Sequence, residues 1–219
     1  MNYLLRLPHR PRAVVFDLDG TLIDSEALVL QAYMAAAQRH DVPFTHAQFL
    51  SLVGRHRQHS EMKMREYFGA RFPLQEFYAA VADHIGDSCA PLKPGAIALL
   101  DRLEASDTPF ALATSSGPAW VEKHLTAHGL SRRFGAIVTR EDVTNGKPHP
   151  EPYLTAADRL RQPPESVLAI EDSPTGVASA HAAGLMTIMI PDLIEPDADT
   201  RSRVIHVGRS LEDLCDLFS

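Results

Sequence analysis

The stretch AVVFDLDGT, residues 13–21, decides the fold of this chain. Its first four residues are all apolar, which predicts a short strand buried on both faces, as in the centre of a parallel sheet. Asp17 and Asp19 follow, and Gly20 permits the sharp turn that must come next. Since side chains two apart in extended chain share a face, both carboxylates are expected on one side, where one can attack while the other handles a proton.

Further apolar runs predict strands at 109–113, 136–138, 167–170 and 186–190. Between and after them, amphipathic segments predict helices near 118–128, 150–161, 174–183 and 210–218. This alternation is typical of parallel β-α-β units. The sequence therefore predicts the α/β class, with a Rossmann-like parallel sheet at its core.

Residues 25–90 have a different character, because they lack strand-like runs and are rich in helix formers. We expect a small all-helical cap domain here, inserted into a core made of residues 1–24 and 91–219. The larger side chains of this segment are expected mainly in its own core, with at least one lining the pocket: Tyr33, Met34, Met62, Met64, Tyr67, Phe68, Phe77 and Tyr78.

Polar or ionisable residues follow the predicted strands, at the edge where open parallel sheets bind their ligands. The second strand leads into Thr114 and Ser115, the third toward a turn with Lys147, and the fourth into Glu171 and Asp172. Carboxylates gathered at one edge repel one another, and a metal ion would offset that repulsion. Hard oxygen ligands of this kind suit Mg²⁺, which commonly bridges carboxylates and a substrate phosphate.

Four short motifs then resemble those of the haloacid dehalogenase-like hydrolase superfamily. In order they are DLDGT at 17–21, ATS at 113–115, GKP at 146–148 and IEDS at 170–173. A helical cap between the first and second motifs resembles the subfamily of phosphoglycolate phosphatases, small sugar-phosphate phosphatases and β-phosphoglucomutase. The resemblance covers nearly the whole chain.

This resemblance implies a role for each motif. Asp17 would be the nucleophile that forms an aspartyl-phosphate, and Asp19 the general acid and base. Thr114, with the neighbouring Ser115, would bind the transferring phosphoryl group. Lys147 would neutralise charge on the nucleophile and the phosphate. Phosphoryl transfer depends on such positioning and charge neutralisation, and a covalent intermediate divides it into two easier steps.

The resemblance also implies a Mg²⁺ cofactor. Asp172 would bind the ion together with Asp17 and the backbone carbonyl of Asp19, with Glu171 in support. The expected activity is hydrolysis of a small phosphorylated metabolite, such as a sugar phosphate or a phosphoglycolate-like compound.

Other functions compete with this prediction. A sugar phosphomutase of the β-phosphoglucomutase type would return the phosphoryl group to a sugar, but residues 26–29 lack the histidine that enzyme carries after its first motif. A dehalogenase would replace the second acid, whereas Asp19 is present. A catalytically idle binding module on the same scaffold is the alternative outside the enzymes.

Composition restricts the partners. A net charge of −7 argues against nucleic acid or an anionic membrane as the main partner. The two cysteines, Cys89 and Cys215, form no C-x-x-C pair, which favours reduced thiols and a cytoplasmic protein. The sequence carries no signal for an oligomeric state.

Two weaker patterns concern basic residues. The cationic cluster at 54–59 favours a solvated helix start, with Arg55 or Arg57 contacting the substrate as the functional alternative. His124 and His128 lie four apart on a predicted helix, where two ligands alone do not make a metal site. We expect both histidines at the surface.

Overall fold

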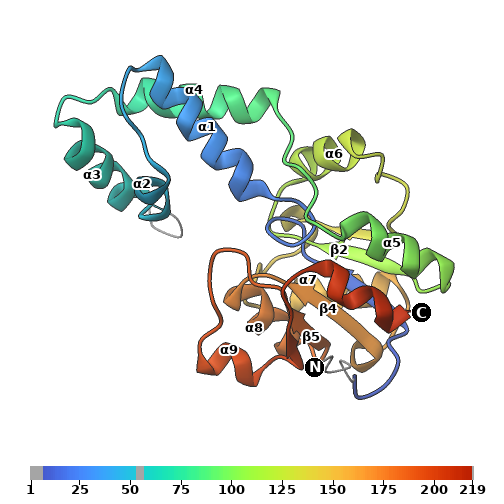
Figure 1. Ribbon diagram of the computed structural model, residues 1–219. Helices are drawn as coiled ribbons and strands as arrows, with labels where there is room; N and C mark the ends of the chain where they lie inside the picture. The colour runs from blue at the N-terminus through green and yellow to red at the C-terminus, as the bar shows by residue number, and fades with distance from the viewer. Residues whose placement is uncertain (1–6, 53–56, 219) are drawn as a thin grey trace. The chain divides into compact units, whose positions relative to one another are not determined.

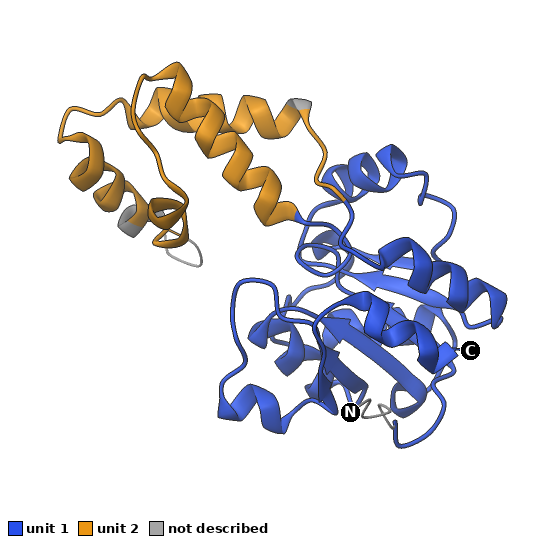
Figure 2. Ribbon diagram, viewed as in Figure 1, with its two compact units in different colours: residues 1–24, 92–219 blue, residues 25–91 orange. Residues whose placement is uncertain are grey.

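The computed structural model describes residues 7–52 and 57–218, and it divides into two compact units. Unit 1 combines Met1–Asp24 with Leu92–Ser219, and unit 2 is Ser25–Pro91 (Figure 2). The division after Pro91 lies one residue from the predicted end of the cap at residue 90.

Within the described residues, unit 1 holds a six-stranded parallel sheet in the order β3-β2-β1-β4-β5-β6. The strands are β1 Ala13–Phe16, β2 Phe110–Ala113, β3 Ala136–Val138, β4 Val167–Glu171, β5 Met186–Met189 and β6 His206–Val207. The predicted α/β class with a parallel core sheet is therefore confirmed. The sequence did not predict β6, because two half-buried residues leave no pattern.

Helices follow most of the strands (Figure 1). They are α5 Ala96–Ala105, α6 Pro118–Ala127, α7 Glu151–Arg159, α8 Pro174–Ala182 and α9 Ala198–Ser202, with 3₁₀ segments η1 Arg140–Asp142, η2 Pro164–Ser166 and η3 Leu211–Phe218. Small side chains of the sheet, such as Val15 and Ala169, share one buried cluster with Tyr153 of α7 and Ala180 of α8. Small residues in the strands let these helices lie close to the sheet.

The strand order creates a switch point at β1. Phe16 pairs with Leu112 of β2 on one side and with Ile170 of β4 on the other. The Asp17 amide continues this ladder by donating to the Ile170 carbonyl at 3.0 Å. Ligands of open parallel sheets bind in the crevice at such a switch point, beyond the carboxyl ends of the strands.

Unit 2 is a helical bundle with an aromatic core. It contains α1 Ser25–Arg39, α2 His46–Leu50, α3 Arg57–Phe68 and α4 Leu74–Asp87, of which α1 and α4 pack on each other. The Tyr33 ring lies 5.6 Å from those of Phe44 and Phe77. Met34 and Met62 are 44% and 62% exposed, so the prediction that they pack in this core was wrong.

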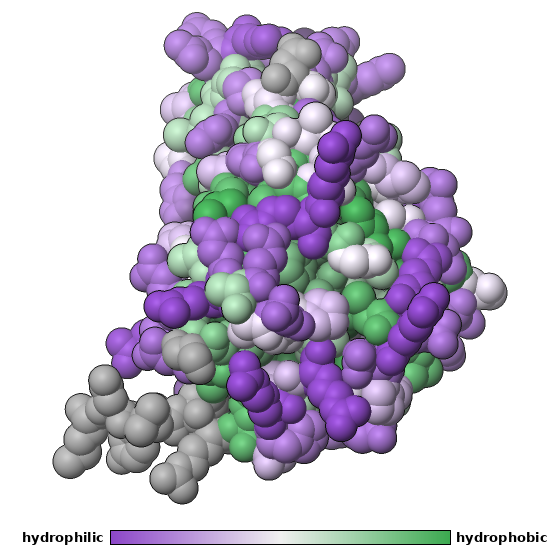
Figure 3. Space-filling model, turned by 90° about the vertical axis from the view of Figure 1, so that its right-hand side faces the viewer, coloured by the Kyte–Doolittle hydropathy of each residue, from purple (hydrophilic) through white to green (hydrophobic). Residues whose placement is uncertain are grey.

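One face of the molecule is shown by residue hydropathy in Figure 3. On this face hydrophilic residues predominate, and hydrophobic ones lie in small patches between them. Over residues 7–52 and 57–218, none of the helices combines the length and the apolar character that crossing a membrane requires.

Candidate active site

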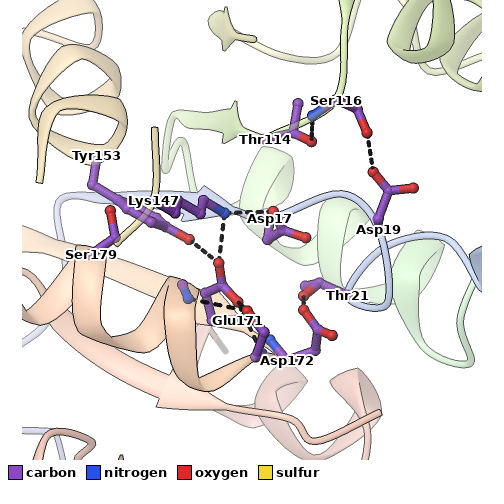
Figure 4. Close-up of polar contacts among 12 residues, drawn as sticks. Asp17, Asp19, Thr21, Thr114, Ser116, Lys147, Tyr153, Glu171, Asp172 and Ser179 are labelled. Carbon is purple, nitrogen blue, oxygen red and sulfur yellow. Dashed lines mark hydrogen bonds and ion pairs between the residues drawn. The ribbon is translucent and has the colours of Figure 1, made fainter. Parts of the chain in front are cut away.

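The carboxyl ends of β1 and β4 and the loop before α7 bring four ionisable side chains together (Figure 4). The Lys147 ammonium donates to Asp17 Oδ1 and to Glu171 Oε1, both at 2.6 Å. Lys147 is 5% exposed, and Glu171 is fully buried. Asp172 continues the chain from Glu171 at the same edge. Residues far apart in the sequence thus form one buried charged cluster.

Glu171 is held by donors on both of its oxygens. Oε1 also accepts from the Tyr153 hydroxyl at 2.8 Å, and Oε2 accepts from the Asp172 amide at 3.0 Å and the Ser173 hydroxyl at 3.0 Å. A Cβ on Gly176 would clash with the Glu171 carboxylate, so only glycine fits there. Burial alone would raise the pKa of Glu171, but the charge and hydrogen bond of Lys147 and the other donors lower it. Glu171 therefore serves as a fixed anion that holds Lys147.

The pKa values of the other two carboxylates, Asp17 and Asp172, are raised rather than lowered. Burial raises the pKa of Asp17 to about 7 against the attraction of Lys147. Burial, reinforced by the charges of Glu171 and Asp17, raises the pKa of Asp172 to about 9. One ammonium therefore faces three carboxylates, and the cluster favours a further positive charge.

Thr21, Gly20 and a further acidic residue, Asp192, lie beside Asp172. The Thr21 hydroxyl donates to Asp172 Oδ1 at 3.3 Å. A Cβ on Gly20 would clash with Asp172 Oδ2 and lie 3.3 Å from Asp192 Oδ2, and Gly20 itself has a φ of +83°. Asp192 Oδ1 accepts from Lys93 at 2.7 Å, while its buried Oδ2 has no partner among the described residues. Asp192 follows β5, so the strand-end rule could have found it.

Asp19 has a different set of partners from Asp17. Its Oδ2 accepts from the Ser116 hydroxyl at 2.6 Å, and its Oδ1 accepts from the Trp120 indole N–H at 2.9 Å. The buried Thr114 hydroxyl accepts from the Ser116 amide at 3.0 Å, whereas the Ser115 side chain is exposed. In Figure 4 the Asp19 carboxylate points toward Ser116, and that of Asp17 turns to Lys147.

The predicted surface position of His124 was wrong. His124 is fully buried, its ring centroid lies 4.0 Å from that of Trp120, and its Nδ1 donates to the Trp120 carbonyl at 2.8 Å. Burial lowers the pKa of His124, so the ring is neutral at pH 7. His128 is half-buried.

The predicted substrate contacts of the cationic cluster are not described. Arg55 lies outside the described residues, and Arg57 begins α3 without a described side chain. Sequence reasoning also missed four side chains that hold the site: Thr21, Ser116, Trp120 and Tyr153. Thr21 lies within the DLDGT motif and Ser116 directly follows the ATS motif, so these two had an available signal.

The donor set fits a hard divalent cation. Asp17 and Asp172 are available to it, whereas Glu171 is occupied by Lys147, Tyr153 and Ser173. Over the described residues, no three acidic, histidine or cysteine side chains are arranged to enclose an ion. Mg²⁺ commonly takes one or two carboxylates and completes its shell with water and phosphate, so two side chains suffice.

Comparison with known proteins agrees with this geometry. A family model for haloacid dehalogenase-like hydrolases matches residues 14–190. The validoxylamine A 7'-phosphate phosphatase of Streptomyces hygroscopicus subsp. limoneus is 30% identical and covers 94% of this chain and 95% of its own. The phosphorylated carbohydrates phosphatase of Thermotoga maritima is 31% identical, covering 80% of this chain and 83% of its own. A Thermotoga maritima structure provisionally assigned as a β-phosphoglucomutase matches with a TM-score of 0.81 and 26% identity, covering 94% of this chain and 97% of that one.

This chain therefore belongs to the haloacid dehalogenase-like hydrolases. It is an enzyme of the phosphoric monoester hydrolase class. The predicted family and enzyme class are confirmed, and the idle binding module is set aside.

Proposed function

We propose that the enzyme is a Mg²⁺-dependent phosphatase that hydrolyses a small phosphorylated metabolite, a sugar phosphate or a phosphoglycolate-like compound, through an aspartyl-phosphate. The observation that carries the proposal is the Lys147 ammonium, bound to Asp17 and Glu171 in a buried cluster that includes Asp172. Because three carboxylates surround one ammonium, this cluster would attract a phosphate group only with a further cation, such as Mg²⁺, in place.

In the first half-reaction an Asp17 carboxylate oxygen attacks phosphorus. The new oxygen–phosphorus bond forms as the bond to the leaving alcohol breaks, and Asp19 gives that alcohol its proton. Thr114 and the adjacent backbone, including that of the exposed Ser115, orient the phosphoryl oxygens. Lys147 offsets the negative charge that Asp17 and the phosphoryl group share.

In the second half-reaction water attacks the phosphorus of the aspartyl-phosphate. Asp19, now ionised, takes a proton from that water, and the bond between phosphorus and Asp17 breaks. Orthophosphate leaves, and the Asp17 carboxylate is restored for the next turnover.

Asp17, Asp172 and the Asp19 carbonyl would hold the magnesium ion. Glu171 would contribute indirectly, by binding Lys147. The ion would neutralise phosphoryl charge and keep the buried carboxylates ionised.

Relatives support the substrate class. One is named for phosphorylated carbohydrates and the other for validoxylamine A 7'-phosphate. We further propose a cytoplasmic enzyme that acts on small molecules rather than on nucleic acid or at a membrane. Neither Cys89 nor Cys215 forms a disulfide bond within the described part of the chain, which is consistent with a reducing compartment.

Orthophosphate release from a panel of sugar phosphates and phosphoglycolate tests the proposal. We expect release with Mg²⁺, none with EDTA, and recovery when Mg²⁺ is restored. Turnover that is unchanged in EDTA would overturn the metal dependence.

A phosphomutase is the second candidate, favoured by the similarity to the Thermotoga maritima structure assigned as a β-phosphoglucomutase. It would move the phosphoryl group between two hydroxyls of one sugar. The same panel separates the two activities, because a mutase forms a sugar-phosphate isomer and releases little orthophosphate.

A further inference from the structure

Both oxygens of the Asp19 carboxylate are bound by one segment of the chain. Ser116, in the loop after β2, donates to Oδ2 at 2.6 Å. Trp120, in the first turns of α6, donates to Oδ1 through its indole nitrogen at 2.9 Å. The two donors approach the two oxygens separately, and together they fix the rotation of the carboxylate group.

The indole of Trp120 is itself held in place. His124, one helical turn further along α6, is fully buried and lies with its ring centroid 4.0 Å from that of Trp120. Its Nδ1 donates to the Trp120 carbonyl at 2.8 Å. A neutral, buried ring against one side of the indole limits the rotamers of Trp120, so the N–H stays directed at Asp19.

We propose that Trp120 is a positioning residue for Asp19. Its indole N–H, with the Ser116 hydroxyl, holds the Asp19 carboxylate in the orientation from which it exchanges a proton with the leaving alcohol and the attacking water. This rests on the proposed function, in which Asp19 is the acid and base. Trp120 touches no reacting atom and acts through Asp19.

The simpler explanation is that Asp19 only satisfies the indole donor, as buried tryptophan N–H groups require. That requirement applies to buried indole donors, whereas Trp120 is only partly buried. Asp19, in contrast, has both oxygens taken by Ser116 and Trp120. The two explanations differ in what happens to turnover when the indole donor is removed.

The hydrogen bond is tested first in the metal-free enzyme, independently of turnover. Because Trp120 is the one tryptophan, a ¹H–¹⁵N spectrum contains a single indole cross-peak. We expect Asp19→Ala to move that peak and Asp101→Ala, at an exposed acid of α5, to leave it in place. An unmoved peak in Asp19→Ala would overturn the proposal.

Turnover is tested with Trp120→Phe, which keeps an aromatic ring against His124 and removes the donor. We expect kcat to fall about tenfold with KM within about twofold, because the lost bond serves the chemical steps. Phe134→Leu, which loses an aromatic side chain near the opposite end of the sheet, is the matched control and should keep the parent kcat. Should Trp120→Phe fail to fold, Ser116→Ala removes the companion bond and is expected to lower kcat in the same way.

The outcomes separate this inference from the proposed function. A normal kcat in folded Trp120→Phe, alongside an inactive Asp17→Asn, would overturn the role of Trp120 and leave the phosphatase intact. A rise in KM with unchanged kcat would also overturn it, since it would place Trp120 in substrate binding. Full activity in Asp17→Asn would overturn the proposed function, while the indole cross-peak would still report the bond to Asp19.

Discussion

Replacing Asp172 by asparagine should stabilise the metal-free enzyme at neutral pH. Burial, then the charges of Glu171 and Asp17, raises the pKa of Asp172 from 3.8 to about 9. A raised folded-state pKa means that the protonated form is favoured in the fold. The stability associated with Asp172 is therefore complete below pH 3.8 and is lost progressively as the pH rises toward 9.

The size of the effect follows from the window between these two values. Between pH 5 and pH 7 the unfolded carboxyl is ionised and the folded one is protonated, and each pH unit is equivalent to 1.36 kcal/mol. Asp172 should therefore lower the free energy of unfolding by about 3 kcal/mol over these two pH units. The exact folded pKa matters little, because pH 7 lies below it.

Urea denaturation in EDTA at pH 5 and pH 7 measures this difference. We expect the parent to lose about 3 kcal/mol more than Asp172→Asn between the two pH values. Asp142→Asn is the control, because the Arg159 hydrogen bond lowers the pKa of Asp142 to about 2. Its contribution is complete above pH 3.8 and is lost only as the pH falls through about 2. The free energy of unfolding of Asp142→Asn should therefore differ from that of the parent by the same amount at pH 5 and at pH 7.

Saturating Mg²⁺ extends the test, since the ion binds the ionised carboxylate. It should restore the stability of the parent at pH 7 and have little effect on Asp172→Asn. Parallel pH profiles for the parent and Asp172→Asn in EDTA would refute the electrostatic reasoning, whatever Mg²⁺ does.

Three further predictions follow from the same cluster. Asp17→Asn should abolish orthophosphate release while the far-ultraviolet circular dichroism spectrum stays that of the parent, and residual turnover of even a tenth would contradict a nucleophilic role. Tyr153→Phe removes a donor to the buried Glu171 and should lower the free energy of unfolding by about 1.5–3 kcal/mol in urea, so an unchanged midpoint would argue against that bond. Gly176→Ala should unfold at a markedly lower temperature, because its Cβ would meet Glu171. The control is Gly86→Ala in α4, where a Cβ meets nothing within 4 Å, and it should be neutral or stabilising. Similar melting temperatures for the two variants would contradict this.

The sheet was predictable because each strand of unit 1 that carries a site residue is a short apolar run that stops at a polar one. Residues 13–16 and 136–138 were predicted with the bounds that β1 and β3 have in the structure. The strand β6, His206–Val207, offers two half-buried residues and no alternation, so periodicity could not find it.

The parts of the site that come from helices were harder to predict. Tyr153 of α7 and Trp120 of α6 reach the strand ends from the side, and a helical pattern assigns such residues to packing. His124 shows a signal that was available but not used. Val121, His124 and Leu125 are the buried residues of α6, at the spacing of one helix face, so the pattern favoured burial over a surface position.

The arrangement around Lys147 explains why this cluster needs Glu171 as well as Asp17. Glu171 is held by donors on both oxygens, and the Lys147 nitrogen also lies 4.9 Å from the centroid of the Tyr153 ring. Lys147 is therefore positioned by groups that do not react. In the proposed reaction Asp17 changes from a free carboxylate to an aspartyl-phosphate, and the ammonium would not need to move. Its charge would already be in place as negative charge develops on the phosphoryl group. A lysine bound to Asp17 alone would have to reorganise at each half-reaction, and the buried Glu171 removes that cost.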